Sequence, residues 1–209
     1  MTDTTAEVLS NGAALGHGPP AGAPGRPVIQ IVPLKGLPVV AVILAFLAAS
    51  IGFNWQWGLD FNHVAGGALW TGIDLFVGLV VGPILGRLSI PARAEFSARF
   101  MPKMVLLMPT LVAMTLASGF QLALDLGNLK ATSPNHAWLV ASFIVVGVMA
   151  TIALGVLEPA NLAVLFEMRK PRPNGEVIAK LMKRFIYTAG ITGVMQVGTL
   201  IIMTRVASR

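Results

Sequence analysis

The chain carries five apolar segments, each long enough to cross a membrane as an α-helix. A spanning helix needs about 20 mainly apolar residues. The qualifying segments cover residues 37–57, 63–86, 104–124, 137–166 and 185–204. The apolar positions are continuous and do not alternate with polar ones, so a transmembrane β-barrel is excluded. We therefore predict an all-α, polytopic transmembrane helical bundle of about five spans, forming one membrane domain over residues 28–209.

Residues 1–27 lack any apolar period and are rich in Gly, Ala and Pro. Such a composition buries too little apolar surface to offset the entropy of ordering, so we predict a flexible tail. The tail does not begin with a basic stretch followed by an apolar core, and we do not expect it to be a signal peptide.

The composition agrees with a membrane protein. Only 11% of the 209 residues are charged, against about 25% in soluble domains. The chain has no cysteine, which excludes disulfides and thiolate metal sites. The net charge of +6 is divided among short segments between apolar runs. This favours contact of basic cytoplasmic loops with anionic lipids, and we expect no nucleic-acid partner.

The distribution of Lys and Arg predicts the orientation. Twelve of the 15 basic residues fall in the N-terminal segment, between spans two and three, or between spans four and five. Because such residues are enriched in cytoplasmic loops, we predict a cytoplasmic N-terminus and an external C-terminus in the inner (cytoplasmic) membrane. Trp55, Trp57 and Trp138 then lie at the outer interface, where aromatic side chains are favoured.

One face of the second span combines residues of unusual chemistry. His63, Gly66, Gly67, Trp70 and Asp74 follow one another at offsets of 3, 4, 7 and 11 from the histidine. These offsets share one face of a helix. The glycines would admit a flat cofactor or another helix close to the backbone. The alternative is a helix-packing face capped by an interfacial histidine.

Two carboxyl groups lie inside the apolar runs, those of Asp74 and Glu158. An ionised carboxyl is costly in lipid, so such groups are usually paired, protonated or directed into a cavity. Proton or cation handling is one interpretation of both. For Glu158 the alternative is a structural ion pair with Arg87 or Arg169.

Further along the second span, Gly78, Gly82 and Gly86 are spaced four residues apart. Small residues at this spacing let transmembrane helices approach closely. They predict a packing face, either within the chain or with a membrane-protein partner or a second copy.

Spans two and four follow a similar pattern. Each begins at a histidine, His63 or His136, and approaches a proline, Pro83 or Pro159. The spacings differ, so a parallel repeat of span pairs is one hypothesis and chance similarity is the other.

The two histidines are candidate metal ligands, since both fall at the outer ends of their spans. Neutral imidazole is a common ligand of metals and of haem iron. Without thiolate or a nearby carboxylate, His63 and His136 suit haem iron or copper better than structural zinc. The alternative is that each is simply a solvated interfacial side chain.

A short region resembles a known family. His63, Gly66, Gly67, Trp70 and Gly72, followed by residues 95–100 and the pair 118–119, resemble the CopD-like membrane superfamily. That superfamily includes copper-resistance D proteins, and the HemJ-type protoporphyrinogen oxidase is similar in outline. The resemblance covers residues 60–125 and implies haem b or copper binding near the outer face, with His63 as ligand. The methionine and histidine clusters of a dedicated copper importer are missing.

The sequence leaves three functions open. The first is a CopD-like protein that binds haem b or copper. The second is a non-catalytic structural or assembly subunit of a membrane complex. The third is a small proton-coupled transporter that uses Asp74. No nucleotide-binding, hydrolase or kinase motif is present, so no catalytic residue is assigned and enzymatic activity stays undecided.

Overall fold

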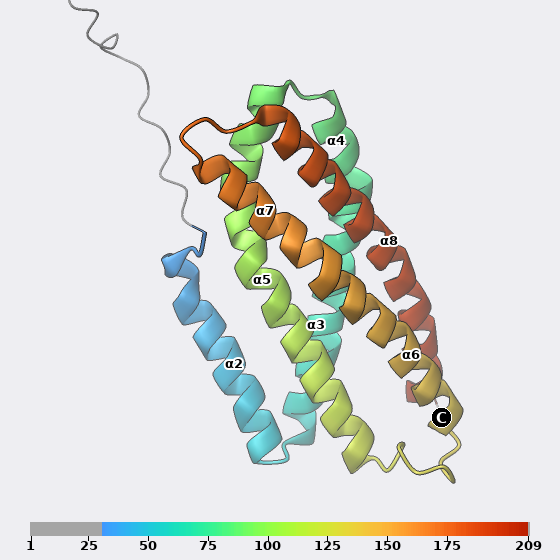
Figure 1. Cartoon of the computed structure of the whole chain (residues 1–209). Coiled ribbons are helices and arrows are strands. Elements are labelled where there is room, and N and C mark those ends of the chain that lie inside the picture. The colour runs from blue at the N-terminus through green and yellow to red at the C-terminus, as the bar shows by residue number, and fades with distance from the viewer. Residues whose placement is uncertain (1–30, 209) are drawn as a thin grey trace, which may run out of the picture.

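A computed structural model describes residues 31–208, and all the regular secondary structure in that range is helical. It contains five helices long and apolar enough to cross a membrane (Figure 1). This confirms the predicted all-α bundle with five candidate spans. The tail predicted over residues 1–27 lies outside the described residues.

Three of the candidate spans contain more than one helical element. The first joins a 3₁₀ turn (Leu34–Gly36) to α2 (Leu37–Gly52). The second comprises α3 (Gln56–Phe76), a π-helical segment η2 (Val77–Val81) and α4 (Gly82–Arg87). The third is α5 (Ile90–Asp125). The fourth comprises α6 (His136–Ile152), a π-helical segment η3 (Ala153–Leu157) and α7 (Glu158–Arg169). The fifth is α8 (Gly175–Ala207).

The first span is shorter than predicted. Its helix ends at Gly52, whereas the apolar run predicted residue 57. Asn54 adopts a positive φ of 49°, a conformation that Asn tolerates better than most residues and that reverses the chain. Trp55 and Trp57 therefore belong to the turn and to the start of α3.

At the opposite end, helices extend beyond the apolar segments. Ser89 caps α5, and the Asn174 side chain accepts hydrogen bonds from the first turn of α8, which stabilises both starts. Arg93 and Lys183 consequently lie on helices, although the sequence placed them in loops.

The two ends of the bundle differ in composition, and Figure 1 shows them at its upper and lower edges. We call the end with the connections 88–89 and 170–174 the basic end. We call the end with the connections 53–55 and 126–135 the tryptophan end, since Trp55, Trp57 and Trp138 lie there and are all partly exposed.

The π-helical segments explain how two spans accommodate a proline. Pro83 and Pro159 each follow a π-helical segment by two residues. Proline has no N–H to donate and its ring crowds the preceding turn, and a π-helical turn is one way in which a transmembrane helix adjusts. The pattern shared by spans two and four in the sequence therefore recurs as a shared local structure.

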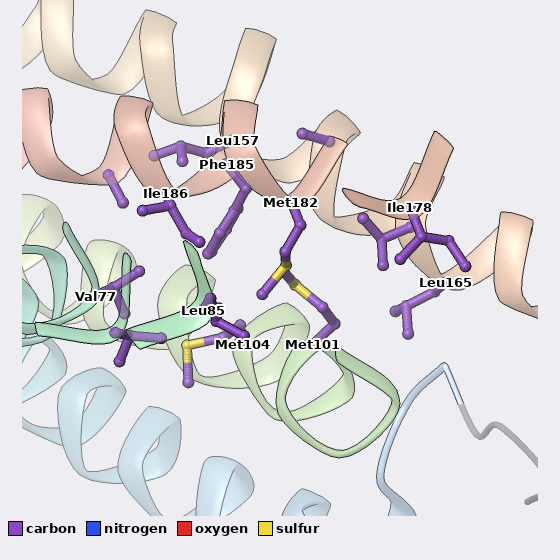
Figure 2. Packing of buried hydrophobic residues seen from close by; sticks show 14 of the residues in the cluster. Val77, Leu85, Met101, Met104, Leu157, Leu165, Ile178, Met182, Phe185 and Ile186 are labelled. Carbon is purple, nitrogen blue, oxygen red and sulfur yellow. The ribbon is translucent and has the colours of Figure 1, made fainter. Parts of the chain in front are cut away.

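Apolar side chains fill the half of the bundle nearer the basic end. Figure 2 shows Met101 and Met182 pointing toward one another at the centre of this cluster. Both are buried. The cluster comprises Val77, Val81, Leu85, Met101, Met104, Ala153, Leu157, Ala160, Val164, Leu165, Ile178, Met182, Phe185, Ile186 and Ala189.

Two of the three glycines in the predicted packing face are used within the chain. A Cβ added at Gly78 would lie 2.4 Å from the Cα of Gly190 in α8, and one at Gly82 would lie 2.6 Å from Ile186. A Cβ at Gly86 would meet nothing within 4 Å. The face therefore joins α8 to the second span, which was one of its two predicted uses, and only Gly86 is left open.

Candidate functional site

A cavity of about 220 Å³ lies between α3, α5, α6 and α8 on the side of the tryptophan end. Its walls are mainly apolar and aromatic, with a few polar side chains from all four helices. The lining residues are His63, Val64, Gly67, Ala68, Trp70, Thr71, Thr115, Leu116, Gly119, Phe120, Leu139, Ser142, Phe143, Val146, Met149, Gln196, Thr199, Leu200 and Met203. We call this space the outer cavity, after the orientation that the distribution of Lys and Arg predicts.

His63 is held in one orientation at the wall of the outer cavity. Its Nδ1 lies 2.8 Å from the carbonyl oxygen of Thr115. Because a carbonyl only accepts, Nδ1 carries a proton, and in the neutral ring Nε2 then keeps its lone pair. The ring packs against Gly119, where an added Cβ would come within 2.5 Å of it. Gly119 is therefore required for this position of the imidazole.

The other residues of the predicted helical face divide between two roles. Gly66 packs against α5, since a Cβ there would lie 2.7 Å from Thr115 Oγ1. Gly67 lines the outer cavity. Trp70 also lines the cavity, is buried, and contacts Leu111. One glycine therefore serves helix packing, while the other belongs to the cavity wall.

Asp74 lies deeper than the outer cavity and is almost fully buried. Its Oδ2 accepts hydrogen bonds from Gln196 Nε2 at 2.8 Å and from Thr192 Oγ1 at 3.1 Å. Gln196 in turn lines the cavity, and its Oε1 is buried without a hydrogen-bond partner among the described residues. The amide nitrogen of Gln196 points toward the carboxyl group of Asp74. The amide oxygen is left as a free acceptor.

The intramembrane carboxyls have no ion-pair partner within residues 31–208. The two salt bridges there join Glu95 to Arg99 and Glu167 to Lys170. Glu158, at the start of α7, is partly buried. It forms no salt bridge with the two arginines considered for it in the sequence.

His136 is not placed with His63 at the outer cavity. It is the first residue of α6 and is absent from the lining residues. Its Nδ1 is buried and has no hydrogen-bond partner in the described part of the chain. Nor does that part contain a group of three His, Cys, Asp or Glu side chains able to hold a metal.

Sequence reasoning missed several residues of the cavity. Met149 and Met203 bring thioethers from α6 and α8, and Gln196 brings an amide. A single amide inside an uncharged apolar span was a usable signal for Gln196. The methionines gave none, because methionine is an ordinary residue in apolar cores.

Comparison with known proteins adds no relative, since no family model, curated protein or solved structure matches the chain. The five long apolar helices place it among candidate multi-pass membrane proteins. Anything more specific depends on the residues around the outer cavity and Asp74.

Proposed function

We propose that the protein is a multi-pass protein of the inner membrane that binds copper(I) through His63 in the outer cavity. The observation that carries the proposal is the hydrogen bond of 2.8 Å between His63 Nδ1 and the Thr115 carbonyl. Metal-binding histidines almost always donate their other ring N–H to such an acceptor, which fixes the ring and its tautomer. Nε2 of His63 is then the ligand.

Copper(I) suits this cavity better than haem b, the other cofactor implied by the CopD-like resemblance. Its volume of about 220 Å³ is below the roughly 300–1,000 Å³ typical of pockets for organic ligands. Met149 and Met203 line the same cavity as His63. Thioethers and imidazole together favour copper(I) over harder metals. These three side chains are the proposed ligand set, and a copper ion bound there would be stored or passed on near the outer face.

The test is a titration of the purified protein with copper(I) under reducing, anaerobic conditions, in competition with a chromogenic chelator. We expect about one copper per chain, lost in His63→Ala and retained in the matched control His136→Ala. Circular dichroism checks that both variants keep their helices. Equal copper binding by wild type and His63→Ala would contradict the proposal. If the protein contains no copper and shows a haem absorption spectrum that disappears in His63→Ala, the cofactor is haem b instead of copper.

Asp74 supports a second candidate function, proton-coupled transport. The carboxyl is buried in mid-span and held by two neutral donors, Thr192 and Gln196. Intramembrane carboxyls without a cationic partner are typical of proton pathways. If neither metal nor proton handling is found, the non-catalytic assembly subunit becomes the leading candidate.

We also propose that the basic end of the bundle faces the cytoplasm, as the distribution of Lys and Arg predicts. A reporter active only in the cytoplasm, fused after residue 172, should then give signal. The same reporter fused after residue 130 or 209 should give none. Signal from the fusion at residue 209 would show that the orientation is the reverse of the predicted one or that the chain has one span fewer.

A further inference from the structure

A second, larger hollow lies on the opposite side of Asp74, toward the basic end. It encloses about 850 Å³ and runs between the second span and α8. We call it the glycine groove. Its lining residues are Gly78, Leu79, Gly82, Pro83, Leu85, Gly86, Arg93, Ala179, Met182, Lys183, Ile186, Tyr187, Gly190, Ile191, Val194 and Met195.

Small residues on both walls leave this space unfilled. The second span and α8 touch at Gly78 and Gly190, where the two backbones meet. Toward the basic end the helices continue past Gly82, and at Gly86 an added Cβ would meet no atom within 4 Å. The groove thus follows the line of contact between the two helices on both sides of Gly78 and Gly190, and it reaches Gly86 toward the basic end.

Two cations line the part of the groove nearer the basic end. Arg93 donates hydrogen bonds from Nε to the Leu88 carbonyl and from Nη2 to the Gly86 carbonyl, which holds its guanidinium beside Gly86. Lys183 comes from the facing wall, and its ammonium lies 5.6 Å from the centre of the Tyr187 ring. None of the lining residues is acidic.

Because the helices that form it are long and apolar enough to span a membrane, we infer that the groove faces the hydrocarbon layer. Leu79 and Val194 on its rim are 65% and 63% exposed. Its apolar walls would therefore be covered by lipid chains or by another protein. Its cationic end would then lie at the depth of the lipid phosphates.

We propose that the glycine groove binds an anionic phospholipid, with its acyl chain between the second span and α8 and its phosphate at Arg93 and Lys183. Arg forms directional hydrogen bonds with phosphate, and Lys adds a positive point charge. Basic pockets between spans on the cytoplasmic side are a known mode of anionic lipid binding. This inference does not depend on the copper proposal.

Charge argues against a second copy of the chain as the occupant. A two-fold dimer in a membrane has both copies in the same orientation, so the patch pairs with itself. Arg93 and Lys183 of both copies would then lie at the same depth in the membrane. No carboxylate lines the groove to neutralise these charges. Juxtaposed like charges disfavour such an interface.

The test measures binding of phosphatidylglycerol and of phosphatidylcholine with matched acyl chains to detergent-purified protein by native mass spectrometry. Gly86→Leu fills the groove without a backbone clash, and Lys183→Gln removes one cation. Gly198→Leu is the matched control for the first, since a Cβ at Gly198 also meets nothing within 4 Å and this residue lies outside the groove. Lys180→Gln, one turn earlier on α8, is the control for the second.

We expect Lys183→Gln to weaken phosphatidylglycerol binding by about fivefold, the typical effect of one basic residue at an anionic membrane surface. Gly86→Leu should lower phosphatidylglycerol binding by at least as much, and both controls should bind like wild type. Equal losses in Lys183→Gln and Lys180→Gln would overturn the proposal, because general surface charge would then explain the binding. A dimer in the wild type that Gly86→Leu turns into a monomer, without a change in lipid binding, would also overturn it.

Discussion

The two halves of the bundle are built on different principles. The half near the basic end contains a continuous cluster of apolar side chains from four of the spans, with Met101 and Val164 fully buried. The other half contains a small cluster around Trp70, the outer cavity and several buried polar groups. Dense packing supplies stability, whereas a cavity with oriented polar groups costs stability and is typical of binding sites. The comparison assigns the dense apolar interior to one half and the buried polar groups around a cavity to the other, while the glycine groove lies on the surface of the first half.

Unpaired polar atoms show the same asymmetry. Five buried side-chain atoms in the described residues have no hydrogen-bond partner, and only that of Asn161 lies near the basic end. The others are at or toward the tryptophan end, in Asn62, Asn135, His136 and Gln196. Buried atoms of this kind cost about 1–3 kcal/mol each unless a ligand or water binds them. Of these four residues only Gln196 lines the outer cavity, so a ligand bound there could pair its amide oxygen.

The largest expected loss of stability comes from placing a side chain in the tight contact between the second span and α8. Gly78→Leu places a side chain where the backbone of Gly190 already lies. Because backbone yields less readily than a side chain, we expect a loss of at least about 3 kcal/mol, the upper part of the usual range for overpacking. Unfolding with SDS in mixed micelles, followed by circular dichroism, measures it. The control Gly72→Leu adds the same side chain where a Cβ meets nothing within 4 Å.

The next effect is a difference in stability between two leucine variants, one in each half. Leu165 is completely buried in the apolar cluster, whereas Leu139 borders the outer cavity. We expect Leu165→Ala to cost about 2–5 kcal/mol, as for other large-to-small changes in packed cores. Leu139→Ala should cost clearly less, because part of that side chain faces empty space and has fewer contacts to lose. Equal losses in the same SDS titration would contradict the comparison.

The smallest expected effect on stability is that of Asp74→Asn. Asparagine keeps an oxygen that can accept from Gln196 and Thr192, and it removes a charge that is costly to bury. We expect the free energy of unfolding to stay within about 1 kcal/mol of wild type or to rise.

The same variant tests transport, since proton uptake into vesicles driven by a potassium diffusion potential should vanish if Asp74 carries protons. Asp60→Asn, at an exposed carboxyl on the same helix α3, is the control. A variant that folds and conducts like wild type would leave Asp74 a structural role only.

The fold was largely predictable from the sequence, because the requirement for about 20 apolar residues per span depends on length and composition alone. The five apolar runs became five long helices. Their ends were less predictable. The helices α5 and α8 begin several residues before their apolar segments, since Ser89 and Asn174 cap them and charged side chains do not stop a helix. The first helix ended early, because Asn54 reversed the chain.

The candidate site was predictable only in part. The helical period of α3 placed His63, Gly67 and Trp70 on one face, and all three line the outer cavity. Periodicity within one helix says nothing about what the facing helices contribute. Met149, Met203 and Gln196 come from α6 and α8 and reach the cavity only through packing.

By itself the sequence determined the number of helices, their apolar character and the unequal charge of the two ends, all of which are properties of short stretches of chain. The tertiary structure decided which groups meet: His63 with the Thr115 carbonyl, Asp74 with Gln196, and Gly78 with the backbone of Gly190. These contacts join residues between 52 and 122 positions apart. They depend on how the helices pack against one another. Because lipid is as apolar as the helix surfaces, small residues and polar pairs determine that packing.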